Sequence, residues 1–230
     1  MEIAKILHNN RDKVSTLSSL HMVQVSYMAF RMPEPDNVLD KLVFELKKLP
    51  GIGEKTATRL AHFILRQPEV FATDLAHALL EARQKLHSCD LCCTFSENPT
   101  CDICSNENRT EEIVCVVEEP SDVAAFEKAR GFNGKYHVLH GALSPLDGID
   151  ESRLKIRQLQ DRIQKGIIKE VILATNPTVE GDTTALYIAR LIKSNTIKVS
   201  RIAHGIPVGA QIEYLDGATL GKALQNRVSL

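Results

Sequence analysis

The sequence predicts a multi-part protein of mixed α+β and α/β class, because three different patterns follow one another along its 230 residues. Helical hydrophobic periods flank a glycine-rich turn in the first third of the chain. Two Cys-x-x-Cys pairs come next. Short apolar runs then alternate with helical periods, which is typical of a mostly parallel sheet covered by helices. We therefore expect a helical unit, a cysteine loop, an α/β domain and a C-terminal arm, in that order.

The composition is that of an ordinary globular protein, with 43% hydrophobic and 25% charged residues and a formal net charge of −1. This balance gives no global attraction for nucleic acid, so any DNA contact must come from a local patch or from the assembly of several chains. The apolar stretch at residues 22–30 is too short to span a bilayer, and no export signal is apparent. We expect no contact with a membrane.

Residues 1–35 form a leader that carries little pattern. Arg31-Met32-Pro33-Glu34-Pro35 ends any helix there. The leader is either an extra partner-binding arm or a loose segment, including a translation start placed too early, with Met32 the true start. We expect it to be disordered or mis-started, because terminal segments without core residues are usually loose.

Residues 36–88 are expected to form a helical unit. The apolar side chains of its first helix recur at helical spacing, at Leu39, Leu42, Val43 and Leu46. A second helix starts at Glu54 and a third covers residues 73–88. The third helix is expected to turn its leucines inward, at Leu75, Leu79, Leu80 and Leu86.

The turn between the first two helices, Leu49-Pro50-Gly51-Ile52-Gly53, is a candidate DNA site. Glycines permit positive φ and close approach of a partner, and the free N–H groups of the next helix favour an anion. Between Lys47 and Arg66 there are five Lys and Arg side chains and one acid, Glu54. The DNA-binding candidates are Gly51, Gly53, Lys55, Arg59, Lys47 and Lys48. The alternative is a plain turn between two core helices.

Residues 89–110 carry two Cys-x-x-Cys pairs separated by eight residues, at Cys89, Cys92, Cys101 and Cys104. Each pair suits one edge of a tetrahedral site, and four sulfur ligands leave no position for water or substrate. We therefore expect one structural Zn²⁺ per chain, with no catalytic role. A pair of disulfides or a redox Cys-x-x-Cys is the alternative, disfavoured by the lack of any sign of secretion.

Residues 111–203 are expected to form the α/β domain, with strands at 113–117, 136–139, 170–175 and 198–202. Acids at the carboxyl ends of such strands mark the functional edge of the sheet. Glu118 follows the first strand, and the segment from Asn176 to Asp182 follows the third. Residues 204–230 are expected to form an arm that wraps the sheet or a neighbouring subunit.

Two of these parts resemble known modules. The stretch from Leu49 to Ala61 resembles the helix-hairpin-helix motif, which binds the sugar-phosphate backbone without reading sequence. Residues 111–203 resemble the Toprim domain of bacterial primases and of type IA and II topoisomerases, with Glu118 in its first acidic motif. Catalytic members hold Mg²⁺ with two aspartates one residue apart, where this chain has Asn176 and Thr178. Divalent-metal chemistry is therefore expected to be lost or weakened.

The order of the parts, with Arg201-Ile-Ala-His-Gly-Ile-Pro-Val-Gly209, resembles the RecR family of recombination mediators from about Leu39 to Leu224. The resemblance implies a non-enzymatic, cytoplasmic and nucleoid-associated DNA-repair protein. It would form a homo-oligomeric ring or clamp, bind DNA without sequence preference, and load RecA onto gapped DNA with the partners RecO, RecF or both. The chain departs from the family in its leader and in Cys93, where a glycine is more usual.

The acid Glu118 is the candidate partner-binding residue, because an acidic sheet edge without metal can persist as a charged docking surface. A solvated loop acid is the plainer interpretation. Two other functions stay open: a Mg²⁺-dependent Toprim enzyme of the nuclease or primase type, and a purely structural zinc adaptor. The first would need a close acidic pair after the third strand. The second would not need Lys55 and Arg59 beside a glycine turn.

Overall fold

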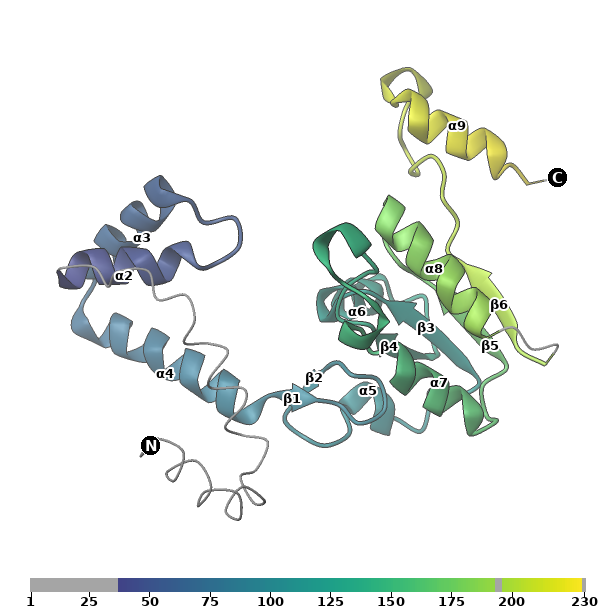
Figure 1. Cartoon of the computed structure of the whole chain (residues 1–230), viewed down its shortest axis with the longest axis horizontal. Helices are drawn as coiled ribbons and strands as arrows, with labels where there is room; N and C mark the ends of the chain where they lie inside the picture. The colour runs from purple at the N-terminus through teal and green to yellow at the C-terminus, as the bar shows by residue number, and fades with distance from the viewer. Residues whose placement is uncertain (1–36, 193–195, 229–230) are drawn as a thin grey trace, which may run out of the picture. The chain divides into compact units, whose positions relative to one another are not determined.

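The computed structural model describes residues 37–192 and 196–228 (Figure 1). The leader at residues 1–35 lies outside the described residues. The chain divides into two compact units, Met1–Leu79 and Leu80–Leu230, and each is described by itself. In the described part of the chain, no helix is long and apolar enough to cross a membrane.

The first unit is built on two packed helices, α2 (Val38–Lys47) and α3 (Glu54–Arg66). The side chain of Asn37 accepts a hydrogen bond from the backbone N–H of Asp40 at 2.8 Å, and this N-cap fixes the start of α2. The small side chains of Ala57 and Ala61 are fully buried against α2, around Val43. The predicted helix, glycine turn and helix are confirmed.

The third helix, α4 (Glu69–Lys85), begins earlier than the sequence predicted and has no buried residue. The expectation that the leucines of this segment face inward is wrong for the described chain. The exposed fraction of each lies between 38% and 65%, for Leu75, Leu79, Leu80 and Leu86. The reason is that α2 and α3 bury their apolar faces against each other, and the described residues supply no third layer for α4.

The second unit begins with a short hairpin of β1 (His87–Ser88) and β2 (Phe95–Ser96), followed by α5 (Asp102–Ser105). A four-stranded parallel sheet follows, in the order β4-β3-β5-β6. The elements of this α/β domain are β3 (Ile113–Val117), α6 (Pro120–Ala129), β4 (Lys135–Val138), α7 (Ile156–Gln164), β5 (Glu170–Leu173), α8 (Val179–Leu191) and β6 (Lys198–Arg201). The predicted mixed fold with a mostly parallel sheet is confirmed.

The two faces of the sheet carry separate cores. Alternate residues of β3 point to opposite faces, so that Val114 and Val116 join one core while Cys115 and Val117 join the other. The first core packs beneath α7 and α8, around Leu159 and the other buried residues of that cluster. The second packs beneath α6 and also receives Cys93 and Ile103 of the cysteine loop. The loop is therefore part of the α/β core.

The cysteine loop also covers the outer edge of β4, which is an edge strand of the sheet (Figure 1). The backbone N–H of Val138 points away from β3 and donates to the carbonyl of Cys92 at 2.8 Å. The carbonyl of Tyr136, on the same edge, accepts from Arg162 at 2.6 Å. The loop and α7 thus satisfy backbone groups that an edge strand would otherwise leave unpaired.

The chain ends in a 3₁₀ turn, η4 (Ile212–Tyr214), and a helix, α9 (Gly217–Gln225). The side chain of Asp216 caps α9 by accepting from the N–H of Thr219 at 2.9 Å. Within the described part of the chain, two side-chain bonds connect this segment to the rest of its unit: Lys222 binds Asp182 at 3.0 Å, and Asn226 donates to the carbonyl of His204 at 3.1 Å.

Burial of His137 in β4 predicts a pH-dependent loss of stability. Burial lowers the pKa of this imidazole to about 4. The unfolded chain, with a pKa near 6.5, therefore binds more protons between the two values, so stability is present above about pH 6.5 and is lost as pH falls toward about 4. We expect wild type to lose about 2 kcal/mol more than His137→Gln between about pH 7 and about pH 5.

Denaturant unfolding of both proteins, saturated with metal, at several pH values measures this difference. Gln is chosen because its amide N–H can replace the bond between the His137 ring nitrogen and the carbonyl of Lys155, at 2.8 Å. Parallel pH profiles for the two proteins would show that the ring is not kept neutral by the fold.

Candidate metal centre and nucleic-acid interface

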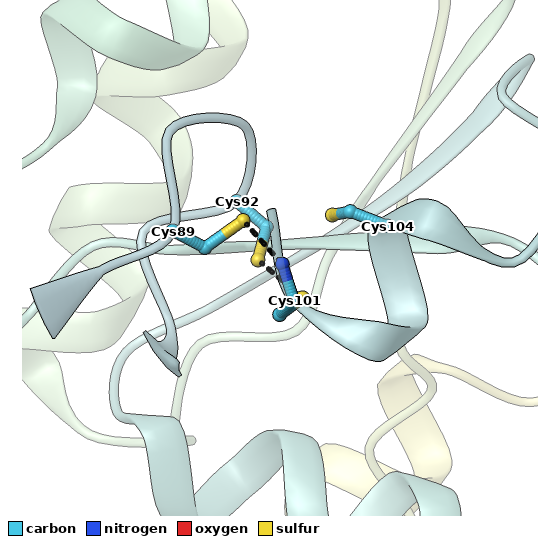
Figure 2. A group of neighbouring side chains, drawn as sticks. All are labelled: Cys89, Cys92, Cys101 and Cys104. Atoms are coloured by element: carbon cyan, nitrogen blue, oxygen red, sulfur yellow. Dashed lines mark hydrogen bonds between the residues drawn. The ribbon is translucent and has the colours of Figure 1, made fainter. Parts of the chain in front are cut away.

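The four cysteines of the two Cys-x-x-Cys pairs converge in one buried cluster (Figure 2). Their sulfur atoms all lie within 4.8 Å of one another, and each residue is at most 6% exposed. All four are free cysteines, so the disulfide alternative is not realised in this structure. In the described chain, they are the one group of three or more His, Cys, Asp or Glu side chains whose ligand atoms meet in this way.

Backbone hydrogen bonds shape each pair for a metal. The N–H of Cys93 donates to the carbonyl of Cys89 at 2.9 Å, which closes the first pair into a tight turn. The N–H of Cys101 donates to the sulfur of Cys89 at 3.3 Å, so the second pair is bound directly to the first (Figure 2). The short helix α5 then brings Cys104 back to the cluster.

The crowding of the sulfurs shifts their proton affinities. Hydrogen bonds from Cys104 and Cys92 lower the pKa of Cys101 to about 2. The bond to Cys101, with burial, raises the pKa of Cys92, and the bond to Cys101 raises that of Cys104 to about 12. One thiolate therefore suppresses ionisation of its neighbours, since buried like charges repel. A soft divalent cation with four thiolate ligands removes this conflict, so the donor set fits a closed tetrahedral metal site.

The glycine turn in the first unit forms an open helix N-terminus. Gly51 has φ of +76°, which requires glycine, whereas Gly53 has an ordinary φ of −83° and is the N-cap of α3. Among the described residues, no side chain caps α3, so the N–H groups of its first turn stay available to an anion. Of the two glycines, only Gly51 is required by backbone conformation.

Lys55 and Arg59 lie on one face of α3, as the spacing predicted. They line a shallow groove of about 550 Å³, with Thr58, His62, Phe63, Arg66 and Gln67. Among the described residues, neither Lys55 nor Arg59 has an ion-pair partner, so both charges are available. Sequence reasoning missed Thr58 and His62, although their helical spacing from Lys55 and Arg59 was a usable signal.

Lys47 and Lys48 have different surroundings from Lys55 and Arg59. Lys47 is in contact with Glu54. Lys48 binds Glu45 at 2.7 Å and stacks over the ring of Phe44, 4.8 Å from its centroid. Both lysines are therefore partly neutralised within the helical unit, and neither lines the groove on α3.

The acid Glu118 lies at the carboxyl edge of the sheet but is only 8% exposed. Its two carboxylate oxygens accept bonds from Asn176, one from the backbone N–H at 2.9 Å and one from the side-chain amide at 2.6 Å. Gly181 packs so closely that a Cβ there would lie 2.7 Å from a carboxylate oxygen of Glu118 and 2.2 Å from the carbonyl of Asn176. The carboxylate is thus closed off by an amide.

Two further residues of the segment after β5, Thr178 and Asp182, are also engaged, whereas Glu180 between them is exposed. Thr178 caps α8 by accepting from the N–H of Gly181 at 3.0 Å. Asp182 binds Lys222 at 3.0 Å and Arg201 at 2.5 Å, and the bond from Lys222, followed by that from Arg201, lowers the pKa of its carboxyl. In the described residues, therefore, Glu118 and Asp182 hold protein groups rather than facing a shared space for a cation.

Comparison with known proteins matches three parts of the chain to family models. The chain matches "RecR, helix-hairpin-helix" over residues 39–83, "Toprim domain" over 112–203 and "RecR, C-terminal" over 205–228. It is 53% identical over 187 residues to "Recombination protein RecR" of Pelotomaculum thermopropionicum, covering 81% of this chain and 94% of that protein.

A second relative, "Recombination protein RecR" of Bdellovibrio bacteriovorus, is 48% identical over 200 residues, which are 84% of this chain and 98% of that protein. The likeness thus extends over nearly the whole of both relatives, and the three matched parts occur in the order in which the structure presents them. The chain belongs to the RecR family of recombination proteins.

Proposed function

We propose that this protein is a non-enzymatic mediator of DNA recombination and repair. It binds DNA without sequence preference as a homo-oligomeric ring or clamp, in the cytoplasm at the nucleoid. With RecO- and RecF-type partners it loads RecA recombinase onto gapped DNA. The observation that carries this proposal is the uncapped N-terminus of α3 beside two unpaired cations, Lys55 and Arg59, because these groups suit phosphates and carry no base-reading pattern.

The charge balance supports an oligomeric binder. One chain with a net charge of −1 attracts DNA weakly at long range. Each α3 surface supplies few phosphate contacts, chiefly the N–H groups after Gly53 together with Lys55 and Arg59. Several copies facing one DNA molecule add these contacts at high effective concentration. Gly51, Lys47 and Lys48 complete the proposed DNA surface, the lysines with a smaller share because acids already pair with them.

The cysteine cluster supports a structural zinc ion, one per chain, held by Cys89, Cys92, Cys101 and Cys104. Four thiolates leave no open position for a reacting ligand. The residues at the carboxyl ends of the strands support the absence of catalysis. Asn176 donates hydrogen bonds to both carboxylate oxygens of Glu118, and neither Asn176 nor Thr178 can supply a negatively charged metal ligand. Glu118 serves instead in partner binding, by fixing the segment from Asn176 to Asp182 at the rim of the sheet.

Replacing one metal ligand should destabilise the protein. Metal analysis of wild type is expected to find about one zinc per chain. Cys92→Ser should lose the ion and at least about 3 kcal/mol of stability, which is a fall of about 10 °C in Tm for a domain of this size. Cys93→Ala, a neighbouring thiol outside the cluster, should keep the zinc. A wild-type protein that is stable without metal would contradict the proposed structural metal site. Iron in place of zinc would keep the site but contradict the identity of the ion.

Removing two of the unpaired cations of α3 should weaken DNA binding in a salt-dependent way. Each neutralised phosphate contributes about 0.9 to the slope of log K against log salt on duplex DNA. We expect Lys55→Ala with Arg59→Ala to lower affinity at low salt by about tenfold or more and to flatten the slope by about 2 per subunit in contact with DNA.

Fluorescence anisotropy over a range of salt concentrations, with light scattering for the native mass, measures both effects. Lys128→Ala with Arg157→Ala is the matched control, because it removes the same charge from exposed positions of the second unit. Wild-type binding by the α3 variant, or equal binding by a wild-type monomer, would rule out the clamp model.

Disrupting the contact between Glu118 and Asn176 should weaken the binding of a protein partner. Glu118→Ala removes the acceptor that holds Asn176 in place. We expect affinity for a RecO-type partner, measured by titration calorimetry, to fall about tenfold while DNA binding is unchanged. Asp161→Ala, an exposed acid on α7, is the control. Unchanged partner affinity in Glu118→Ala would remove this role.

The same preparations test the enzyme alternative. With Mg²⁺ present, neither wild type nor Glu118→Gln is expected to cleave DNA or to synthesise a primer. Activity in wild type that disappears in Glu118→Gln would establish a Toprim enzyme and overturn the mediator.

A further inference from the structure

Two cations of the α/β domain each bind one of the two Cys-x-x-Cys pairs. The ammonium group of Lys135 on β4 donates to the carbonyl of Cys104 at 2.6 Å. The guanidinium of Arg162 on α7 donates to the carbonyl of Leu91, inside the first pair, at a longer 3.4 Å. Its bond to Tyr136, at 2.6 Å, fixes its position on the edge of β4. Each pair thus has one cation bound to its backbone, at the ligand Cys104 in one pair and at Leu91, the neighbour of the ligand Cys92, in the other.

The charge of the proposed metal centre calls for such neighbours. Four thiolates and one divalent cation carry a net charge of −2. Asp90 and Asp102, which stand inside the two pairs, add further negative charge. A buried site of this charge is costly unless positive groups or N–H donors compensate for it. Lys135 and Arg162 together supply a charge of +2, part of which Glu111, 2.9 Å from Lys135, offsets.

Lys135 is buried further than an ordinary ion pair would require. Its side chain is 4% exposed, although its carboxylate partner Glu111, at 2.9 Å, is 56% exposed. The pair of Lys169 and Glu112 shows the usual arrangement, with side chains 70% and 49% exposed. A lysine that served Glu111 alone would reach its partner at the surface, as Lys169 does. Burial of Lys135 therefore holds its charge beside Cys104 as well as beside Glu111.

We propose that Lys135 and Arg162 balance the charge of the tetrathiolate centre and hold its two cysteine pairs in position. The inference rests on the proposed metal site. It adds that retention of the ion depends on the α/β domain, because both cations come from β4 and α7 rather than from the cysteine loop. The two residues do not ligate the metal, and they act through the charge that they place beside the sulfurs.

The experiment measures metal retention in the full chain. Zinc-loaded wild type, Lys135→Met, Arg162→Met and the surface control Lys169→Met are mixed with excess of a coloured chelator, and the rate of zinc transfer is followed. We expect Lys135→Met and Arg162→Met to release zinc about tenfold faster or more, and Lys169→Met to match wild type. Glu111→Gln should release zinc no faster than wild type, because it removes a negative charge.

A spectroscopic measurement separates charge from mere packing. Cobalt(II) replaces zinc in each protein, and the sulfur-to-cobalt charge-transfer bands are recorded. Loss of a nearby positive charge raises the energy of the sulfur lone pairs, so the bands of Lys135→Met and Arg162→Met should move to longer wavelength. Lys135→Arg, which keeps the charge, should keep the bands near their wild-type position. Circular dichroism of the loaded proteins confirms that each variant is folded.

The outcomes distinguish this inference from the metal site itself. A wild type that binds no zinc would remove the site and the inference together. A zinc-loaded wild type whose folded Arg162→Met and Lys135→Met variants keep its release rate and its cobalt bands would overturn the inference alone. Fast release in Glu111→Gln would also overturn it, because Lys135 would then act only as the partner of Glu111.

Discussion

Closure of the outer edge of β4 is the constraint on which the second unit depends. An edge strand exposes unpaired backbone groups, which cost free energy when buried and recruit other strands when exposed. Here the carbonyl of Cys92 accepts from Val138, and Arg162 donates to the carbonyl of Tyr136. The loop has little apolar core of its own, and Cys93 and Ile103 pack into the sheet instead. Loop and sheet are therefore mutually dependent.

At the carboxyl ends of the strands, where functional residues of such sheets usually lie, the exposed groups are satisfied in a different way. In a sheet of this topology, Glu118 after β3 and the segment after β5 meet because these strands are neighbours. With an acid at position 176 the meeting point would hold two negative charges and favour a divalent cation. With Asn176, an amide and a backbone N–H donate to Glu118 and satisfy the carboxylate. In this structure, the place where the two strand ends meet is therefore a hydrogen-bonded contact between Asn176 and Glu118.

The sequence predicted the elements well and the contacts between them less well. Periodicity was sufficient for β3, whose predicted and observed bounds coincide, and the cysteine spacing predicted the cluster that the structure contains. The start of α8 at Val179 is set by the Thr178 cap, and the period of apolar residues carries no information about caps. The bond between Glu118 and Asn176 joins residues 58 positions apart, and the local sequence pattern does not predict the strand order that brings them together.

The same distinction between composition and contact governs the basic surface. Five Lys and Arg side chains between Lys47 and Arg66 suggested one uniform patch, but acids already engage Lys47 and Lys48. The charges left for a ligand lie on α3, where Lys55, Arg59 and Arg66 line one groove. Its length along a single helix limits the number of phosphates that one chain can meet. In the proposed clamp, strong binding would come from the number of chains around the DNA, so that affinity and assembly would rise and fall together.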